Sequence, residues 1–135
     1  MKLPTSIMNG MQQATVPTCT LIEELIAIAP KSVDADYLDF IAGCDGFSGL
    51  MDNGFYLSLW KVADVIELNP YEPDIIESHD LFFFGSDGSN FGFAFQSGSK
   101  IVGIDFIEIG LEVPKIIAES FEEFLFWVDA TSELP

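Results

Sequence analysis

Residues 84–95 read Phe84-Gly85-Ser86-Asp87-Gly88-Ser89-Asn90-Phe91-Gly92-Phe93-Ala94-Phe95, a polar glycine turn between an apolar run and an alternating segment. After the turn, phenylalanine alternates with small residues. One face of the predicted strand is therefore aromatic, and the other has almost no side-chain bulk. Either another part of the chain packs closely against this bare face, or the face lies open.

Two more segments extend this pattern into a sheet. The apolar run 81–84 precedes the turn, and a third strand-like run, Lys100 to Phe106, follows the connection 97–99. Connections this short join antiparallel neighbours, so the three runs are predicted to form an antiparallel meander. In the third run, Val102, Ile104 and Phe106 share the heavier of the two faces.

Capping residues and prolines mark predicted helices on both sides of the meander. Ser120 and Glu123 have the spacing of a capping box ahead of an apolar stripe, which predicts a helix that can cover the aromatic face of the sheet. Thr20 and Glu23 repeat this spacing ahead of Pro30. The predicted segments are, in chain order, a loose lead-in over 1–18, a helix from Thr20 to Pro30, a helix that begins at Asp34 or Asp36 and ends at Gly43, a glycine-rich loop from Asp45 to Gly54, a strand from Phe55 to Leu59, a short helix from Val62 to Asn69, and a helix from Ser120 to Val128.

Length and composition indicate one folded domain. With 135 residues, 49% of them hydrophobic, and 13 phenylalanines, the chain can close a single core without disulfides or a structural metal. We therefore predict one α+β domain over residues 1–135, with a central, mostly antiparallel β-sheet and helices packed on one face. Cys19 and Cys44 are predicted to be ordinary buried thiols.

The chain is strongly acidic: 22 acidic residues stand against five lysines and no arginine, which gives a net charge of −17. This charge repels phosphate backbones and anionic membranes, so the expected partner is a basic protein and not nucleic acid or a membrane. No run is long and apolar enough for a signal peptide or a membrane span, so a cytoplasmic location is expected. The candidate partner-binding residues are Asp45, Asp64, Glu67, Glu72, Asp74, Glu77, Asp80, Asp87 and Asn90. The alternative is that these side chains only keep the surface solvated.

No arrangement of residues indicates catalysis or a cofactor. His79 is the single histidine, and no nucleophile elbow accompanies it. The glycine turn matches neither a dinucleotide fingerprint nor a P-loop. Asp87 and Asn90 lack the spacing of a calcium loop and are expected to shape the turn. We therefore predict no catalytic residue, cofactor or metal site, and a small hydrolase built on His79 or a carboxylate pair is a remote alternative.

The order of these elements resembles the SUKH superfamily, in particular its branch related to the fungal Smi/Knr regulator of cell-wall synthesis. The resemblance rests on Asp36-Tyr37-Leu38-Asp39-Phe40-Ile41 leading into Cys44-Asp45-Gly46, on the turn Phe84-Gly85-Ser86-Asp87-Gly88, and on Ser120-Phe121-Glu122-Glu123-Phe124-Leu125. It covers the chain from Thr20 to Asp129. The family fold that it implies is α+β, with a mostly antiparallel sheet and packed helices.

The resemblance also implies a function. Bacterial members of the superfamily are mostly immunity proteins that bind and block polymorphic toxins, often nucleases, whereas the fungal branch provides signalling and scaffolding modules. We therefore expect a bacterial immunity protein that neutralises a basic toxin by direct contact, and the alternative is a regulatory or scaffolding interaction module. The matched motif residues are expected to build core and turns, not contacts: Gly46, Phe84, Gly85, Gly88, Phe121 and Phe124.

Overall fold

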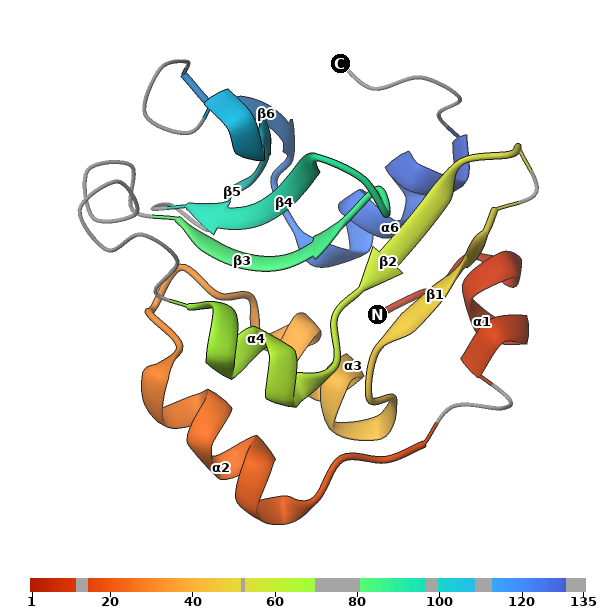
Figure 1. Ribbon diagram of the computed structural model, residues 1–135. Coiled ribbons are helices and arrows are strands. Elements are labelled where there is room, and N and C mark those ends of the chain that lie inside the picture. Colours follow the sequence, from red (N-terminus) through yellow and green to blue (C-terminus); the bar gives the residue numbers. More distant parts are fainter. Residues whose placement is uncertain (12–14, 52, 70–80, 97–99, 109–112, 131–135) are drawn as a thin grey trace.

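The computed structural model describes residues 1–11, 15–51, 53–69, 81–96, 100–108 and 113–130. Within these ranges, five helices accompany one six-stranded antiparallel sheet whose strands lie in chain order, β1-β2-β3-β4-β5-β6 (Figure 1). The predicted α+β class and meander are therefore confirmed. The elements are α1 (Thr5–Met11), α2 (Cys19–Ile28), α3 (Ala35–Gly43), β1 (Phe47–Leu50), β2 (Tyr56–Leu59), α4 (Val62–Leu68), β3 (Phe82–Ser86), β4 (Phe91–Gln96), β5 (Lys100–Asp105), a 3-10 turn (Phe106–Glu108), β6 (Lys115–Ala118) and α6 (Phe121–Ala130).

The register of β4 and β5 places large side chains beside small ones. Phe93 pairs with Gly103, and Ala94 pairs with Val102. Cross-strand neighbours share a face, so at the three central pairs, from Gly92–Ile104 to Ala94–Val102, one bulky residue lies beside one small residue. The aromatic face of β4 and the heavier face of β5 are therefore opposite faces of the sheet.

The aromatic face of β4 lies against α3 and α6, which places the main core there. The Phe93 ring centroid lies 5.0 Å from that of Phe124 in α6, and the Phe95 centroid lies 5.2 Å from that of Tyr37 in α3. Phe84 joins them from β3, with its centroid 4.6 Å from that of Phe95. These edge and tilted contacts are the arrangements that aromatic rings favour. The predicted position of the last helix over the aromatic face is confirmed.

The bare face of β4 is covered by side chains and not by a described helix. A Cβ at Gly92 would lie 2.5 Å from the Phe106 ring and 3.0 Å from the Phe83 ring, so only glycine permits this approach. Ala94 belongs to a second, smaller core cluster with Phe83, and Trp60 packs at its edge. We call this side of the sheet the Trp60 face. Figure 1 shows α6 behind the strands and β3 and β4 in front of it.

Two predicted segments are wrong, and one strand was missed. The lead-in over 1–18 contains α1, whose Ile7 is fully buried and whose Ser6 Oγ lies 3.0 Å from Asp129 Oδ1, so contacts with distant residues order it. The glycine-rich loop contains β1, which pairs with β2 along its whole length. The strand β6 follows the meander and pairs with β5, although no strand was predicted beyond Phe106. Short elements of this kind are stabilised by pairing and packing, which local patterns do not reveal.

One predicted helix start also differs. Thr18, and not Thr20, caps α2: its Oγ1 accepts a hydrogen bond from Leu21 N at 3.3 Å. The predicted end of α3 at Gly43 is confirmed, although the left-handed backbone expected of a glycine that ends a helix is found at Gly46 (φ 85°) and not at Gly43. The capping role of Ser120 is confirmed, because Glu123 N donates to its Oγ at 3.1 Å.

Asp34 caps α3, as one of the two predicted alternatives, and also contacts α6. Its Oδ1 accepts from Asp36 N at 3.0 Å, and its Oδ2 accepts from Phe121 N at 2.9 Å. One carboxylate therefore satisfies a free N–H group at the start of each of the two helices that cover the sheet.

Replacing Asp34 with alanine is expected to lower the free energy of unfolding by about 2 kcal/mol, because both helix starts lose an acceptor. Urea denaturation followed by circular dichroism measures the loss. The matched control is Asp39→Ala, which removes an exposed carboxylate from the same helix and should change stability by less than about 0.5 kcal/mol. Equal effects of the two substitutions would show that the Asp34 hydrogen bonds do not stabilise the fold.

The two cysteines differ in exposure. Cys44 is buried as predicted, whereas Cys19 is exposed at the first position of α2. Burial raises the pKa of the Cys44 thiol, and the negative charge of Asp45 raises it further. Cys44 Sγ also donates to Gly46 O at 3.2 Å. Cys44 is therefore a packed, protonated thiol at neutral pH.

A thiol reagent applied to the native protein near pH 8 is expected to label Cys19 rapidly and Cys44 roughly 100-fold more slowly. The raised pKa leaves little Cys44 thiolate at this pH, and the reagent reaches it only when the structure opens. A Cys19→Ser variant isolates the slow reaction, and urea should accelerate it. Rapid labelling of this variant in the absence of denaturant would contradict the packing of Cys44.

Candidate functional site

Five of the nine candidate partner-binding residues lie in the described part of the chain, and the structure places them in three locations. Asp45 and Asp64 lie near the start of α4, Glu67 lies one turn further along that helix, and Asp87 and Asn90 lie in the turn between β3 and β4. The other four, Glu72, Asp74, Glu77 and Asp80, lie outside the described residues, as does His79.

Asp45 and Asp64 line one surface groove of about 310 Å³. The groove runs between the first two strands and the start of α4, and Ser48, Ser58 and Lys61 also line it. Two carboxylates against one ammonium group leave the groove with a negative charge. The structure therefore brings together two acids that stand 19 positions apart in the sequence.

Asp45 has a structural role within this groove. Lys61 occupies the N-cap position of α4 and makes no side-chain capping bond. Asp45 Oδ1 accepts from Val62 N at 2.9 Å in its place, so a carboxylate from another segment caps the helix. Asp64 is exposed in the first turn of α4, where its charge also complements the helix dipole. Asp64 is consequently the better of the two for testing partner contact, because its substitution leaves the cap intact.

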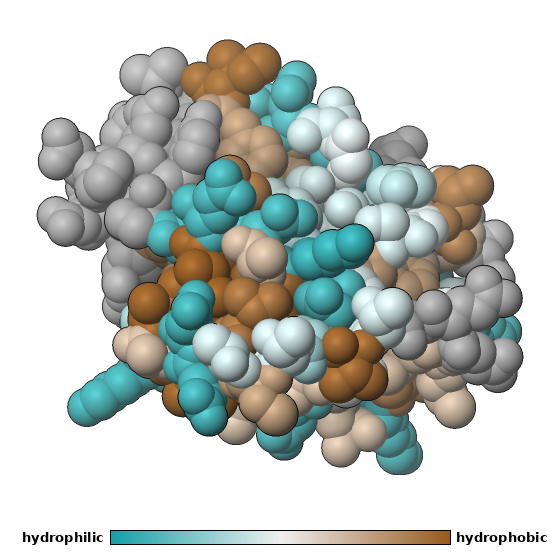
Figure 2. All heavy atoms as spheres, turned by 60° about the horizontal axis from the view of Figure 1, so that its bottom comes forward, coloured by the Kyte–Doolittle hydropathy of each residue, from teal (hydrophilic) through white to brown (hydrophobic). Residues whose placement is uncertain are grey.

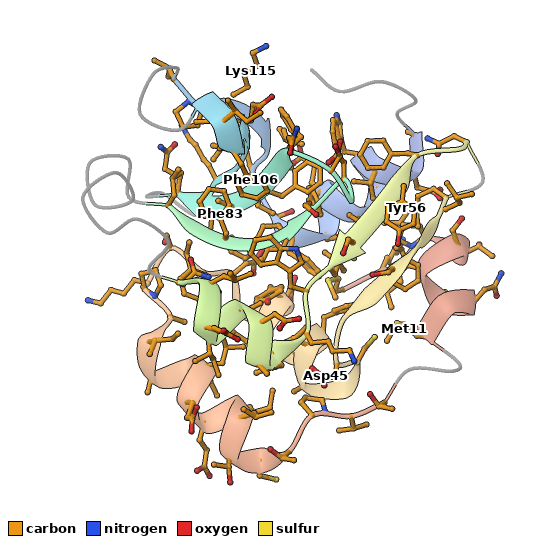
Figure 3. The ribbon with its side chains drawn as sticks, viewed as in Figure 1. Met11, Asp45, Tyr56, Phe83, Phe106 and Lys115 are labelled. Atoms are coloured by element: carbon orange, nitrogen blue, oxygen red, sulfur yellow. The ribbon has the colours of Figure 1, made fainter. Side chains whose placement is uncertain are left out.

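Asp87 and Asn90 form the turn, as predicted, and stand apart from the groove. Asp87 Oδ1 accepts from Ser89 N at 2.9 Å and from Phe91 N at 3.3 Å, and Asn90 O accepts from Phe106 N at 2.6 Å. Tyr56, at the start of β2, lies close to this turn, whereas Asp45 lies at the other end of β2 (Figure 3). The described candidates therefore do not form one continuous acidic site.

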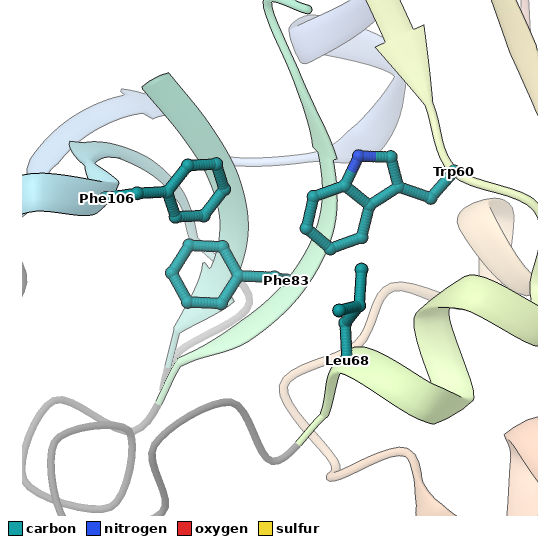
Figure 4. Close-up of a pocket in the computed structure, with 4 residues that line it drawn as sticks. All are labelled: Trp60, Leu68, Phe83 and Phe106. Atoms are coloured by element: carbon teal, nitrogen blue, oxygen red, sulfur yellow. The ribbon is translucent and has the colours of Figure 1, made fainter. Parts of the chain in front are cut away.

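A hollow on the Trp60 face was not predicted. It measures about 230 Å³ and is lined by Trp60, Leu68, Phe83 and Phe106, with the Phe83 and Phe106 rings beside each other and Leu68 reaching from the end of α4 (Figure 4). The Trp60 ring centroid lies 6.2 Å from that of Phe106, with an interplanar angle of 20°. A large aromatic residue directly after a predicted strand was the only sequence signal for this hollow.

The hollow and the groove meet at Trp60, which lines both. Leu68 is 38% exposed and Trp60 and Phe106 are half-buried, so these three lining side chains are accessible to a partner, whereas Phe83 is buried beneath them. Hydrophobic and hydrophilic residues are interspersed on another part of the surface. Figure 2 shows hydrophobic patches separated by hydrophilic residues on the side that is lowest in Figure 1. Aromatic and apolar side chains with polar residues at their rim are a feature of protein-binding sites.

The described residues contain no cluster of three or more histidine, cysteine, aspartate or glutamate side chains that could hold a metal ion. Tyr37 is the one described phenol inside the core, and its hydroxyl has no hydrogen-bond partner. Burial raises the pKa of Tyr37, which keeps the hydroxyl protonated. Its ring packs against Phe84 and Phe121, so its observed role is in packing.

The sequence matches no known family model and no curated protein. Among the described helices, none has the length and apolar character needed to cross a lipid bilayer.

Proposed function

We propose that this protein is an immunity protein of the SUKH type, which binds a basic toxin domain and blocks it by stoichiometric contact. The observation that carries the proposal is the meeting of an acidic groove and an apolar hollow at Trp60, on a chain with a net charge of −17. An apolar centre beside charged groups provides contact area, and the acidic field accelerates encounter with a cationic protein.

The sequence resemblance supports the same proposal. Its turn motif lies between β3 and β4 of the meander, and Phe84, Phe121 and Phe124 are buried in the core, as expected of residues that maintain the fold. The contacts with a toxin are then left to the surface around the groove and the hollow. The toxin class that best fits the charge is a nuclease, whose substrate-binding surface is basic. A bound acidic protein competes there with the nucleic acid.

Co-expression of the toxin domain encoded by a neighbouring gene, with and without this protein, tests the proposal. Survival of the cells and a one-to-one complex on gel filtration are expected. Failure of both rescue and complex formation would reject the immunity role for that pair. Formation of a complex with a basic cellular protein that is not a toxin would indicate the regulatory or scaffolding role in its place.

Charge reversal at the groove tests how the partner approaches. Asp64→Lys is expected to slow association with the basic toxin about fivefold at low salt and to flatten the salt dependence of the association rate. Glu123→Lys is the matched control, since it makes the same change in net charge at an exposed position of α6, which packs on the opposite face of the sheet. Stopped-flow association rates that fall equally for both variants would show that only the overall charge matters.

A further inference from the structure

The groove and the hollow are connected through α4 as well as through Trp60. Asp64 lines the groove and Leu68 lines the hollow. The two residues are separated by one helical turn, so they lie on the same side of α4. A single short segment of a partner can therefore contact a carboxylate and an apolar wall at the same time.

The size and lining of the hollow define what can enter it. The four described lining side chains are apolar or aromatic, and the volume is about 230 Å³. An apolar protein cavity of about 150 Å³ is enough to hold a benzene molecule. The hollow therefore has room for one aromatic or large aliphatic side chain, whose contacts with the half-buried rings of Trp60 and Phe106 would include the favourable ring arrangements.

Charge decides what surrounds that side chain. Asp45 and Asp64 outnumber Lys61 in the groove, and the net charge of −17 disfavours an anionic ligand or a second copy of this chain. A lysine or arginine next to the inserted side chain would reach the groove, and the exposed part of the Trp60 ring adds a cation–π contact.

We infer that the Trp60 face binds a basic partner segment, with one aromatic or large aliphatic side chain in the hollow and an adjacent lysine or arginine in the groove. This inference rests on the proposed function, because it specifies how the toxin would be held. It assigns the binding determinant to Trp60, Leu68 and Asp64.

Three capped peptides provide the probes: Lys-Lys-Phe-Lys-Lys, Lys-Lys-Ser-Lys-Lys and Glu-Glu-Phe-Glu-Glu. Isothermal titration calorimetry at low ionic strength is expected to give the tightest binding for the first peptide. The serine peptide should bind about tenfold more weakly, and the glutamate peptide should not bind measurably. Binding of the serine peptide as tight as that of the phenylalanine peptide would overturn the role of the hollow.

Two pairs of variants locate the binding of Lys-Lys-Phe-Lys-Lys. Leu68→Ala should weaken it about fivefold, whereas Phe126→Ala, which truncates a similarly exposed apolar residue on α6, should not. Asp64→Asn should weaken it about threefold, whereas Glu123→Gln, with the same change in net charge, should leave it within error. Circular dichroism confirms that each variant is folded.

The outcomes separate this inference from the proposed function. Equal weakening by Asp64→Asn and Glu123→Gln, with no effect of Leu68→Ala, would show that the peptide senses only the bulk charge and would overturn the inference. Toxin rescue that persists in the Leu68→Ala variant with unchanged affinity would overturn it too, while leaving the immunity role intact. Failure of the wild-type protein to rescue would instead count against the proposed function.

Discussion

Replacing Phe124 with alanine is expected to lower the free energy of unfolding by about 3–5 kcal/mol, because the substitution leaves a cavity where α6 meets the sheet. Phe124 is fully buried, and its ring centroid lies 5.0 Å from that of Phe93 and 5.3 Å from that of Phe84. A loss of this size is a large fraction of the stability of a small domain. Urea denaturation followed by tryptophan fluorescence and by circular dichroism measures it.

Phe126 is the matched control for this substitution. It lies two positions further along α6 and is 42% exposed, so Phe126→Ala removes the same number of atoms without opening a buried cavity. Its effect should be within about 0.5 kcal/mol. Similar losses for the two variants would contradict the assignment of the main core to the α6 side of the sheet.

Replacing Gly85 with alanine is expected to cost about 1–3 kcal/mol through overpacking. A Cβ at this position would lie 2.7 Å from the backbone oxygen of Ser58 and 3.4 Å from Leu59 Cδ2. Gly85 pairs with Leu59, so the added methyl group would push β3 away from β2 and weaken the junction between the two halves of the sheet. Gly85 belongs to the turn motif, and the close approach of β2 is the physical reason why this position needs a glycine.

Gly49 is the control for Gly85, since it also lies in a strand of the same sheet. A Cβ there would meet only the Phe47 ring at 3.6 Å, which is an ordinary contact. Gly49→Ala should therefore leave stability unchanged or raise it by about 0.5 kcal/mol through the reduced entropy of the unfolded chain. Amide hydrogen exchange gives a second measure, because Gly85→Ala should accelerate exchange in β2 and β3 specifically. Equal denaturation midpoints for the two variants would contradict the close approach at Gly85.

The elements that were predicted correctly carry a strong local pattern. The alternation of Phe91, Phe93 and Phe95 defined β4, and the capping box at Ser120 defined the start of α6. The elements that were missed have little local pattern: β1 contains a glycine in four residues, and β6 is equally short. Their positions depend on hydrogen bonds with β2 and β5, which are set by the whole sheet.

Part of the candidate site could also be predicted from the sequence and part could not. The acidic composition made Asp45 and Asp64 candidate partner-binding residues, and the structure brings these two together in one groove. It also shows that Asp45 caps α4, a role that no local spacing indicated. The hollow at Trp60 required side chains from β2's end, α4, β3 and the 3-10 turn to converge, and no spacing in the sequence relates those segments.

The sequence by itself determined the acidic character, the α+β class and the two-faced strand at 91–96, because these depend on composition and on short-range periodicity. Only the tertiary structure decided what covers the bare face of that strand. Phe83 and Phe106 pack over Gly92. Trp60, which lies more than thirty positions before Gly92 in the chain, packs at the edge of the same cluster. Contacts at such separation depend on how β2, β3 and the end of β5 are placed side by side, and local periodicity carries no information about that placement.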